Sequence, residues 1–100
     1  MRRAALFALL SLGAVPAEAA LSGYYDSAEQ INMILSNAAI ADAVHQAPID
    51  GLTRGKARKD GAVEWIVRTG RCTLKVYLTP VVPDYPGKTT YRVDPPGACK

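Results

Sequence analysis

Histidine and cysteine are scarce in this chain, whose 100 residues include one His and two Cys. So few nitrogen and sulfur ligands cannot build a metal centre of the Cys and His type, and the two cysteines do not form a Cys-x-x-Cys redox motif. A nucleophile triad and a glycine-rich phosphate loop are also missing. The sequence therefore predicts a protein that is not an enzyme and that uses no cofactor or metal.

Long apolar runs are missing as well, since no run reaches the ~18 residues that a transmembrane helix needs. A shorter uncharged stretch, residues 4–15, follows Arg2 and Arg3. Small residues then flank Glu18 at the two positions that a signal peptidase reads. Residues 1–19 are therefore predicted to be a secretory signal peptide, and residues 20–100 a single small domain.

The composition also indicates the destination of export. The chain has an alanine-rich leader, no Asn-x-Ser/Thr glycosylation acceptor and no cysteine beside the cleavage site that could carry a lipid. We expect a bacterial periplasmic protein, with an extracellular location as the alternative. In such an oxidising compartment an even number of cysteines favours a disulfide, here between Cys72 and Cys99.

One amphipathic helix is predicted over residues 27–46. Asp26 or Ser27 can cap its start, because Glu or Gln follows three residues later in each case. Pro48 ends the helical pattern. Apolar residues recur at helical spacing and form one stripe: Ala28, Ile31, Ile34, Leu35, Ala38, Ala41 and Val44. Met33 and Ile40 lie off this stripe, so the pattern leaves open whether the buried face is wide or a second surface covers them.

Two strands follow, at residues 63–69 and 72–79, where apolar and polar residues alternate. Gly70 and Arg71 between them suit a two-residue hairpin turn. That turn sets Val67 opposite Leu74 and Trp65 opposite Val76, so apolar side chains face one another across the pair.

The strand before this hairpin, residues 52–58, carries three cations at alternate positions: Arg54, Lys56 and Arg58. If Asp60 and Gly61 formed a two-residue turn, these cations would share the buried face of Trp65, which is costly. A three-residue loop with Gly61 in the left-handed conformation shifts the pairing by one residue. Gly55 then lies opposite Trp65, and all three cations point outward.

A last strand is predicted over residues 89–94, after a loop over residues 80–88 that is rich in proline. Two registers compete, and we favour the one with Tyr91 opposite Leu78 and Val93 opposite Val76. The fold class is then α+β, with one N-terminal amphipathic helix packed on a four-stranded antiparallel β-meander and one disulfide. This layout resembles that of cystatins, but their Gln-x-Val-x-Gly motif is missing, so no activity is carried over.

Charge is divided unevenly along the chain. Residues 20–53 hold four acids and no Lys or Arg, whereas residues 54–100 hold ten Lys and Arg against four acids. In the predicted fold the cations gather on the uncovered face of the sheet, around an apolar centre typical of binding surfaces. Candidate binding residues are Arg54, Lys56, Arg58, Arg68, Lys75, Arg92, Ile66 and Tyr77, with Tyr85 from the proline-rich loop.

This basic face predicts a small periplasmic binding module, of the inhibitor or accessory-subunit kind, whose partner is an anionic protein or a cell-envelope component. Nucleic acid is not expected, because an exported protein rarely meets it and the face lacks an aromatic stacking row. A merely solvated face is the plainer interpretation. Two further hypotheses are a small enzyme centred on His45 or Glu64, and a structural assembly component with a free sheet edge.

Overall fold

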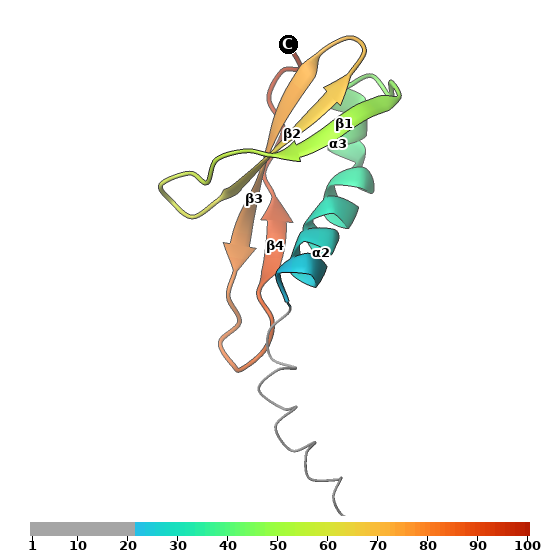
Figure 1. Ribbon diagram of the computed structural model, residues 1–100. Helices are drawn as coiled ribbons and strands as arrows, with labels where there is room; N and C mark the ends of the chain where they lie inside the picture. Colours follow the sequence, from blue (N-terminus) through green and yellow to red (C-terminus); the bar gives the residue numbers. More distant parts are fainter. Residues whose placement is uncertain (1–21) are drawn as a thin grey trace, which may run out of the picture.

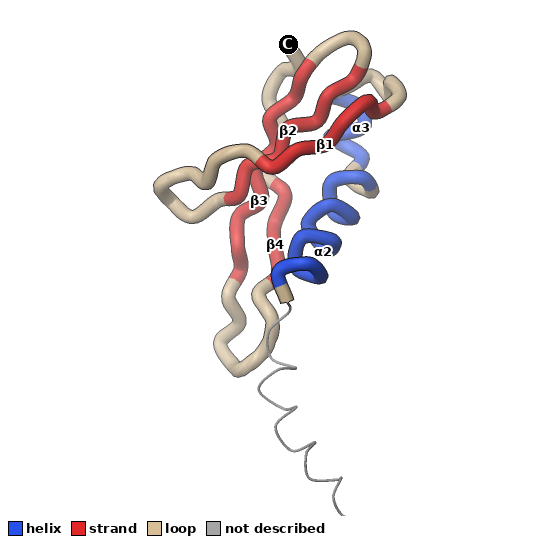
Figure 2. Tube along the Cα trace, in the orientation of Figure 1, coloured by secondary structure: helices blue, strands red, loops and turns tan. Residues whose placement is uncertain are grey.

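The computed structural model describes residues 22–100 and confirms the predicted α+β fold class. The predicted signal peptide, residues 1–19, lies outside the described part. Two helices precede four strands: α2 (Gly23–Leu35), α3 (Ala38–Ala43), β1 (Ile49–Arg54), β2 (Val63–Thr69), β3 (Thr73–Val81) and β4 (Thr90–Val93). The strands form one antiparallel sheet in chain order (Figure 1), and the helices lie against one of its faces (Figure 2). Neither helix in the described range has the length and apolarity to cross a membrane.

The predicted start of the helix, at Asp26 or Ser27, is wrong. The helix begins four residues earlier, because Ser22 caps it and accepts a hydrogen bond from the N–H of Tyr25 at 3.3 Å. A second correction concerns its middle. The helix ends at Leu35, and the Asn37 side chain caps a new helix by accepting from the N–H of Ile40 at 2.9 Å.

This break decides which side chains are buried. Ile40, which lies off the predicted stripe, is only 4% exposed, whereas Leu35, which lies on it, is 53% exposed. The interruption at Ser36 and Asn37 changes the rotational phase between the two helices, so the apolar residues of each can face the sheet. The core consists of side chains from both helices and the two central strands: Ile34, Ile40, Val44, Trp65, Val67, Leu74, Val76 and Leu78.

The predicted three-residue loop around residue 60 is confirmed. Gly61 has φ of +89°, and its N–H donates to the carbonyl of Arg58 at 3.0 Å. The register that follows is nevertheless wrong by one residue, since Arg54 pairs with Trp65 and Gly55 does not. The N–H of Gly55 donates to the carbonyl of Glu64, whereas the N–H of Arg58 donates to that of Ala62. One extra residue therefore bulges out between Gly55 and Arg58.

The bulge changes the side on which Arg54 lies. Its guanidinium carbon sits 4.9 Å from the centroid of the Trp65 ring, and its Nη2 donates to Oγ of Ser27 on α2 at 2.9 Å. Arg54 is thus on the helix-covered side, contrary to prediction. The cost of placing a cation there is avoided because the side chain remains exposed while it stacks on the indole.

The β2–β3 hairpin has the predicted register, with Trp65 opposite Val76 and Val67 opposite Leu74. The favoured β4 register is wrong by two residues, because Val93 pairs with Leu78. A shift of two keeps each side chain on its predicted face. The predicted disulfide between Cys72 and Cys99 is present, and it joins cysteines 27 residues apart in sequence.

Candidate functional site

The candidate site is the outer face of the sheet, meaning the face away from the helices. Cross-strand pairing and side-chain contacts place Thr53 of β1, three residues of β2, four of β3 and two residues at β4 on it. From β2 to β4 these are Glu64, Ile66, Arg68, Thr73, Lys75, Tyr77, Thr79, Arg92 and Asp94. The structure therefore brings together all of the predicted sheet residues of the site except Arg54. From the β1–β2 loop, Arg58 reaches this face by stacking on Tyr77, and Lys56 contacts it through its backbone N–H, which donates to Glu64.

Two glycines of the first strand region make room for long side chains on the outer face. A Cβ at Gly51 would lie 2.2 Å from a guanidinium nitrogen of Arg68, and a Cβ at Gly55 would lie 2.0 Å from a carboxylate oxygen of Glu64. The small residues of this segment thus accommodate Arg68 and Glu64.

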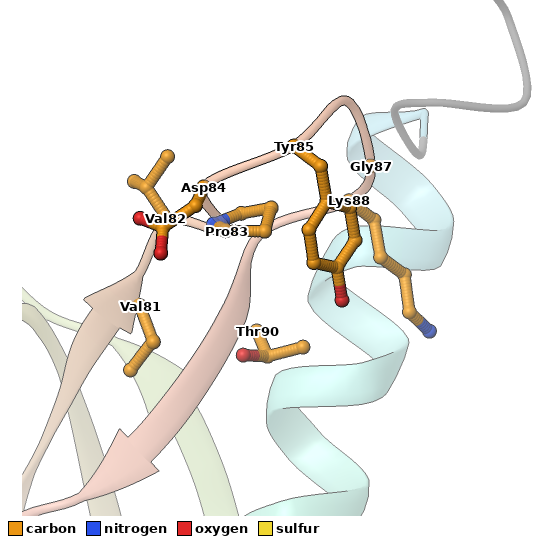
Figure 3. A pocket seen from close by; sticks show the side chains of 8 residues that line it. All are labelled: Val81, Val82, Pro83, Asp84, Tyr85, Gly87, Lys88 and Thr90. Atoms are coloured by element: carbon orange, nitrogen blue, oxygen red, sulfur yellow. The ribbon is translucent and has the colours of Figure 1, made fainter.

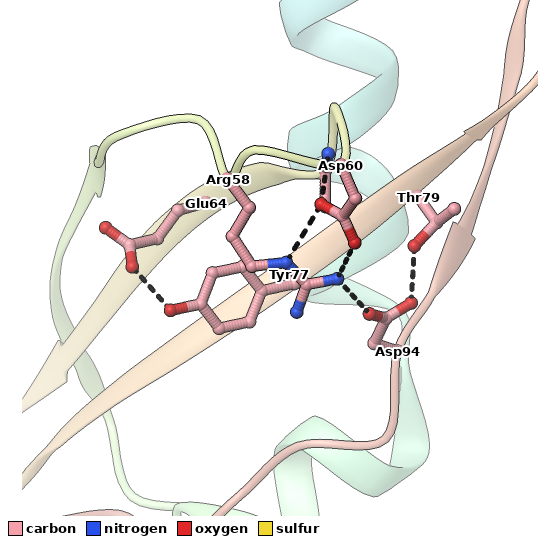
Figure 4. Close-up of polar contacts among 7 residues, drawn as sticks. Arg58, Asp60, Glu64, Tyr77, Thr79 and Asp94 are labelled. Carbon is pink, nitrogen blue, oxygen red and sulfur yellow. Dashed lines mark hydrogen bonds and ion pairs between the residues drawn. The ribbon is translucent and has the colours of Figure 1, made fainter.

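Arg58 forms the centre of a polar cluster on this face (Figure 4). Its guanidinium donates to both carboxylate oxygens of Asp60, at 3.1 and 2.7 Å, and to Asp94 at 3.3 Å. The same group stacks 4.6 Å from the ring centroid of Tyr77, and Thr79 donates to Asp94 at 2.7 Å. Two carboxylates therefore neutralise the charge of Arg58. Its side chain holds these groups together and is less available to bind an anionic partner.

Glu64 and Tyr77 form a second polar pair across β2 and β3. The phenol O–H of Tyr77 donates to Oε2 of Glu64 at 2.7 Å, and the backbone N–H of Lys56 donates to Oε1 at 3.1 Å. The Tyr77 hydrogen bond is the main cause that lowers the pKa of Glu64, and it raises the pKa of Tyr77. At neutral pH Glu64 is an ionised acceptor and Tyr77 a neutral donor, so neither is tuned for proton transfer.

Apart from Arg58, four cations belong to the outer face, and two of them, Lys56 and Lys75, lie near enough to Glu64 to add to the lowering of its pKa. Within the described part of the chain, no ion pair closer than 4.0 Å involves Lys56, Arg68, Lys75 or Arg92. All four are exposed, and the half-buried Ile66 lies directly across from Lys75. Arg68 donates to the hydroxyl of Thr53 at 2.8 Å, which leaves its charge uncompensated.

Tyr85 lies away from this face, in the loop between β3 and β4. The loop borders a hollow of about 690 Å³, and the Tyr85 side chain is 72% exposed (Figure 3). Lys88 in the same loop forms an ion pair with Glu29 of α2. The structure therefore separates Tyr85 from the other predicted binding residues.

His45 follows the C-cap of α3 and has an unusual backbone conformation. Both His45 and Gln46 have φ of +57°, and the N–H of Gln46 donates to the carbonyl of Ala41 at 2.8 Å, as in a Schellman motif. No hydrogen bond in the described range joins the His45 ring to Asp42. The same range holds no group of three His, Cys, Asp or Glu side chains that could bind a metal ion.

Comparison with known proteins finds no matching family model, no matching curated protein and no matching solved structure.

Proposed function

We propose that this chain is an exported, non-catalytic binding module of the bacterial periplasm, of the inhibitor or accessory-subunit kind. Its outer face binds an anionic protein or a cell-envelope component. The observation that carries the proposal is the set of exposed, unpaired cations Arg68, Lys75 and Arg92 around the half-buried side chains of Ile66 and Tyr77.

Electrostatics supports this assignment. Exposed cations without carboxylate partners create a positive potential that attracts anionic partners and raises the association rate. Ile66 and Tyr77 add apolar area that a partner can bury at the centre of the contact. Arg54 does not belong to this surface, and Arg58 contributes through its contact with Tyr77 more than through its charge.

Export and the absence of catalysis are separate parts of the proposal. The N-terminal pattern of Arg2 and Arg3 followed by an uncharged stretch supports export. The disulfide is compatible with an oxidising compartment. Glu64 is held ionised by its hydrogen bonds, and the His45 ring makes no hydrogen bond to a described carboxylate, which supports a binding role over acid–base chemistry.

Charge reversal tests the proposal. The chain is immobilised and used to capture material from bacterial envelope extract, as wild type and as the double variant Lys75→Glu and Arg92→Glu. A matched control reverses Lys59 and Arg71, which lie in the hairpin loops outside the four strands. We expect the outer-face variant to lose its captured partner, the control to retain it, and capture by wild type to weaken as salt shortens the Debye length. Equal capture by both variants would contradict the proposal.

A further inference from the structure

A cleft of about 500 Å³ opens on the outer face between β3 and the C-terminal segment, residues 95–100. We call it the tail cleft. Strand β3 contributes Thr73, Lys75 and Tyr77, and the segment contributes Pro95, Ala98 and Lys100. Two of these side chains, Lys75 and Lys100, are cationic, and Tyr77, Pro95 and Ala98 add an apolar lining.

The backbone of Lys75 is available inside this cleft. Thr73 exchanges two hydrogen bonds with Lys100, at 2.7 and 3.0 Å, and the carbonyl of Tyr77 accepts from Asp94 at 2.9 Å. Lys75 lies midway between these residues, so its N–H and C=O point toward the same side of β3.

The C-terminal segment bulges away opposite Lys75, and within residues 22–100 no backbone hydrogen bond joins the two. Pro95 and Pro96 lie in this bulge and have no N–H to offer. The cleft therefore presents one unused backbone donor and one unused backbone acceptor beside an exposed ammonium group.

The disulfide fixes the C-terminal segment, which forms one wall of the tail cleft. Cys72 precedes Thr73 and Cys99 precedes Lys100, so the bond connects the two chain segments beside the cleft. The Thr73 and Lys100 hydrogen bonds reinforce this connection. A wall that is fixed before binding lowers the entropic cost of binding a ligand.

We infer that the tail cleft binds the carboxylate side chain of an extended acidic peptide segment. The carboxylate accepts from the N–H of Lys75 and lies near the ammonium groups of Lys75 and Lys100, while the carbonyl of Lys75 accepts a peptide N–H. The stem of a glutamate packs on the ring of Tyr77 and on Pro95. This inference rests on the proposed function and adds the chemical class of the partner.

The donor set favours a carboxylate over a phosphate group. Phosphate sites in proteins use arginine forks or several converging backbone N–H groups. The tail cleft offers one N–H and two lysines, and no arginine is among its lining residues. The Glu64 carboxylate lies near enough to Lys75 for the lysine to add to the lowering of its pKa, but the two groups are not within ion-pair distance. The ammonium group of Lys75 can therefore form an ion pair with an anion of the partner.

An NMR titration tests the inference. The ¹⁵N-labelled chain is titrated with a short peptide of glutamates, with a glutamine peptide of equal length, and with inorganic phosphate. We expect saturable shifts of the Lys75, Thr73 and Lys100 amides with the glutamate peptide only. The double variant Lys75→Gln and Lys100→Gln should bind about tenfold more weakly, because charged hydrogen bonds are lost. Lys59→Gln, in the β1–β2 loop and outside the cleft, should bind within about twofold of wild type.

Each other outcome overturns the inference. Equal binding of the glutamine peptide, unchanged affinity of the lysine variant, or tighter binding of phosphate at the same amides would do so. These failures are distinguishable from failure of the proposed function. If envelope capture depends on the outer-face cations and the glutamate peptide shifts no tail-cleft amide, the tail cleft is wrong and the binding face stands.

Discussion

The indole N–H of Trp65 donates a hydrogen bond to the side-chain carbonyl of Gln30 at 2.8 Å, and both residues are buried. Gln30 in turn donates to Asp26 at 3.1 Å, and Asp26 accepts from the hydroxyl of Tyr91 at 2.9 Å. This chain of hydrogen bonds connects α2 to β2 and β4. It orients the helix on an interface that is otherwise apolar, since a displaced helix would leave buried polar groups unpaired.

The variant Gln30→Leu should lower the free energy of unfolding by about 1–3 kcal/mol, because the buried indole N–H loses its acceptor. Urea unfolding monitored by far-ultraviolet circular dichroism measures this loss. The second variant Trp65→Phe removes the donor, so Gln30→Leu should cost less in that background. Equal costs in both backgrounds would show that the hydrogen bond contributes nothing.

The variant His45→Gly should stabilise the protein by about 0.5–1 kcal/mol. His45 has φ of +57°, a left-handed conformation that glycine adopts without a Cβ clash. Thermal unfolding should therefore show a raised Tm. The neighbouring Gln46 has the same φ and provides a matched test, since Gln46→Gly should act in the same direction. A lowered Tm for both variants would contradict the assignment of a strained helix end.

The variant Tyr77→Phe should destabilise the protein in a pH window set by Glu64 and Tyr77. The folded state lowers the pKa of Glu64 below its ordinary 4.5, so this stabilisation is full above pH 4.5 and is lost as pH falls through the folded pKa. The pKa of Tyr77 is raised above its ordinary 10.0, so its stabilisation is lost as pH rises through that higher value. The wild type should therefore exceed Tyr77→Phe in stability most between these limits.

Urea unfolding of both proteins across the pH range measures this difference. The phenylalanine ring keeps the stacking of Arg58, so the variant isolates the hydroxyl. Tyr85→Phe serves as the control, because that side chain is 72% exposed. A Tyr77→Phe difference that does not change between acidic and neutral pH would exclude the Glu64 contact as its cause.

Replacing Cys72 and Cys99 together by serine should cost about 3–4 kcal/mol, because the disulfide restricts the unfolded chain around a long loop. Denaturant unfolding of the oxidised wild type, the reduced wild type and the double serine variant measures the cost. The reduced protein should match the serine variant. A cost below about 1 kcal/mol would mean that the hydrogen bonds between Thr73 and Lys100 hold the C-terminal segment without the disulfide.

The sequence predicts the fold best where only one strand register places the apolar side chains of both strands on the same face. The β2–β3 hairpin is such a case, because a slip of one residue would move Trp65 and Val67 away from the core. Alternation determines only which face a side chain occupies. The two β4 registers place Tyr91 and Val93 on the same face, so the choice depends on distant contacts such as that of Tyr91 with Asp26.

The β1 register was not predictable for a different reason. The turn at Gly61 has the expected conformation, but a bulge before Arg58 leaves no mark in the alternation of the sequence. A cation beside Trp65 is also costly only where its charge is buried. An edge strand lets Arg54 stack on the indole with its side chain exposed, and this removes the expected penalty.

The sequence determines one polar contact of the candidate site but not the others. The pairing of Glu64 with Tyr77 could have been inferred, since the correct hairpin register places them opposite each other. The approach of Asp60 and Asp94 to Arg58 depends on the bulge and on the β4 register. Both were mispredicted, so the neutralisation of Arg58 could not be foreseen.

The claim that the outer face is a binding surface is tested most directly by mapping it in the ¹⁵N-labelled chain mixed with envelope extract. We predict that amide signals of Ile66, Lys75 and Arg92 lose intensity on addition of the extract and recover at high salt. Signals of α2 should remain unchanged. Intensity losses confined to α2, or no loss at the outer face at low salt, would contradict the account.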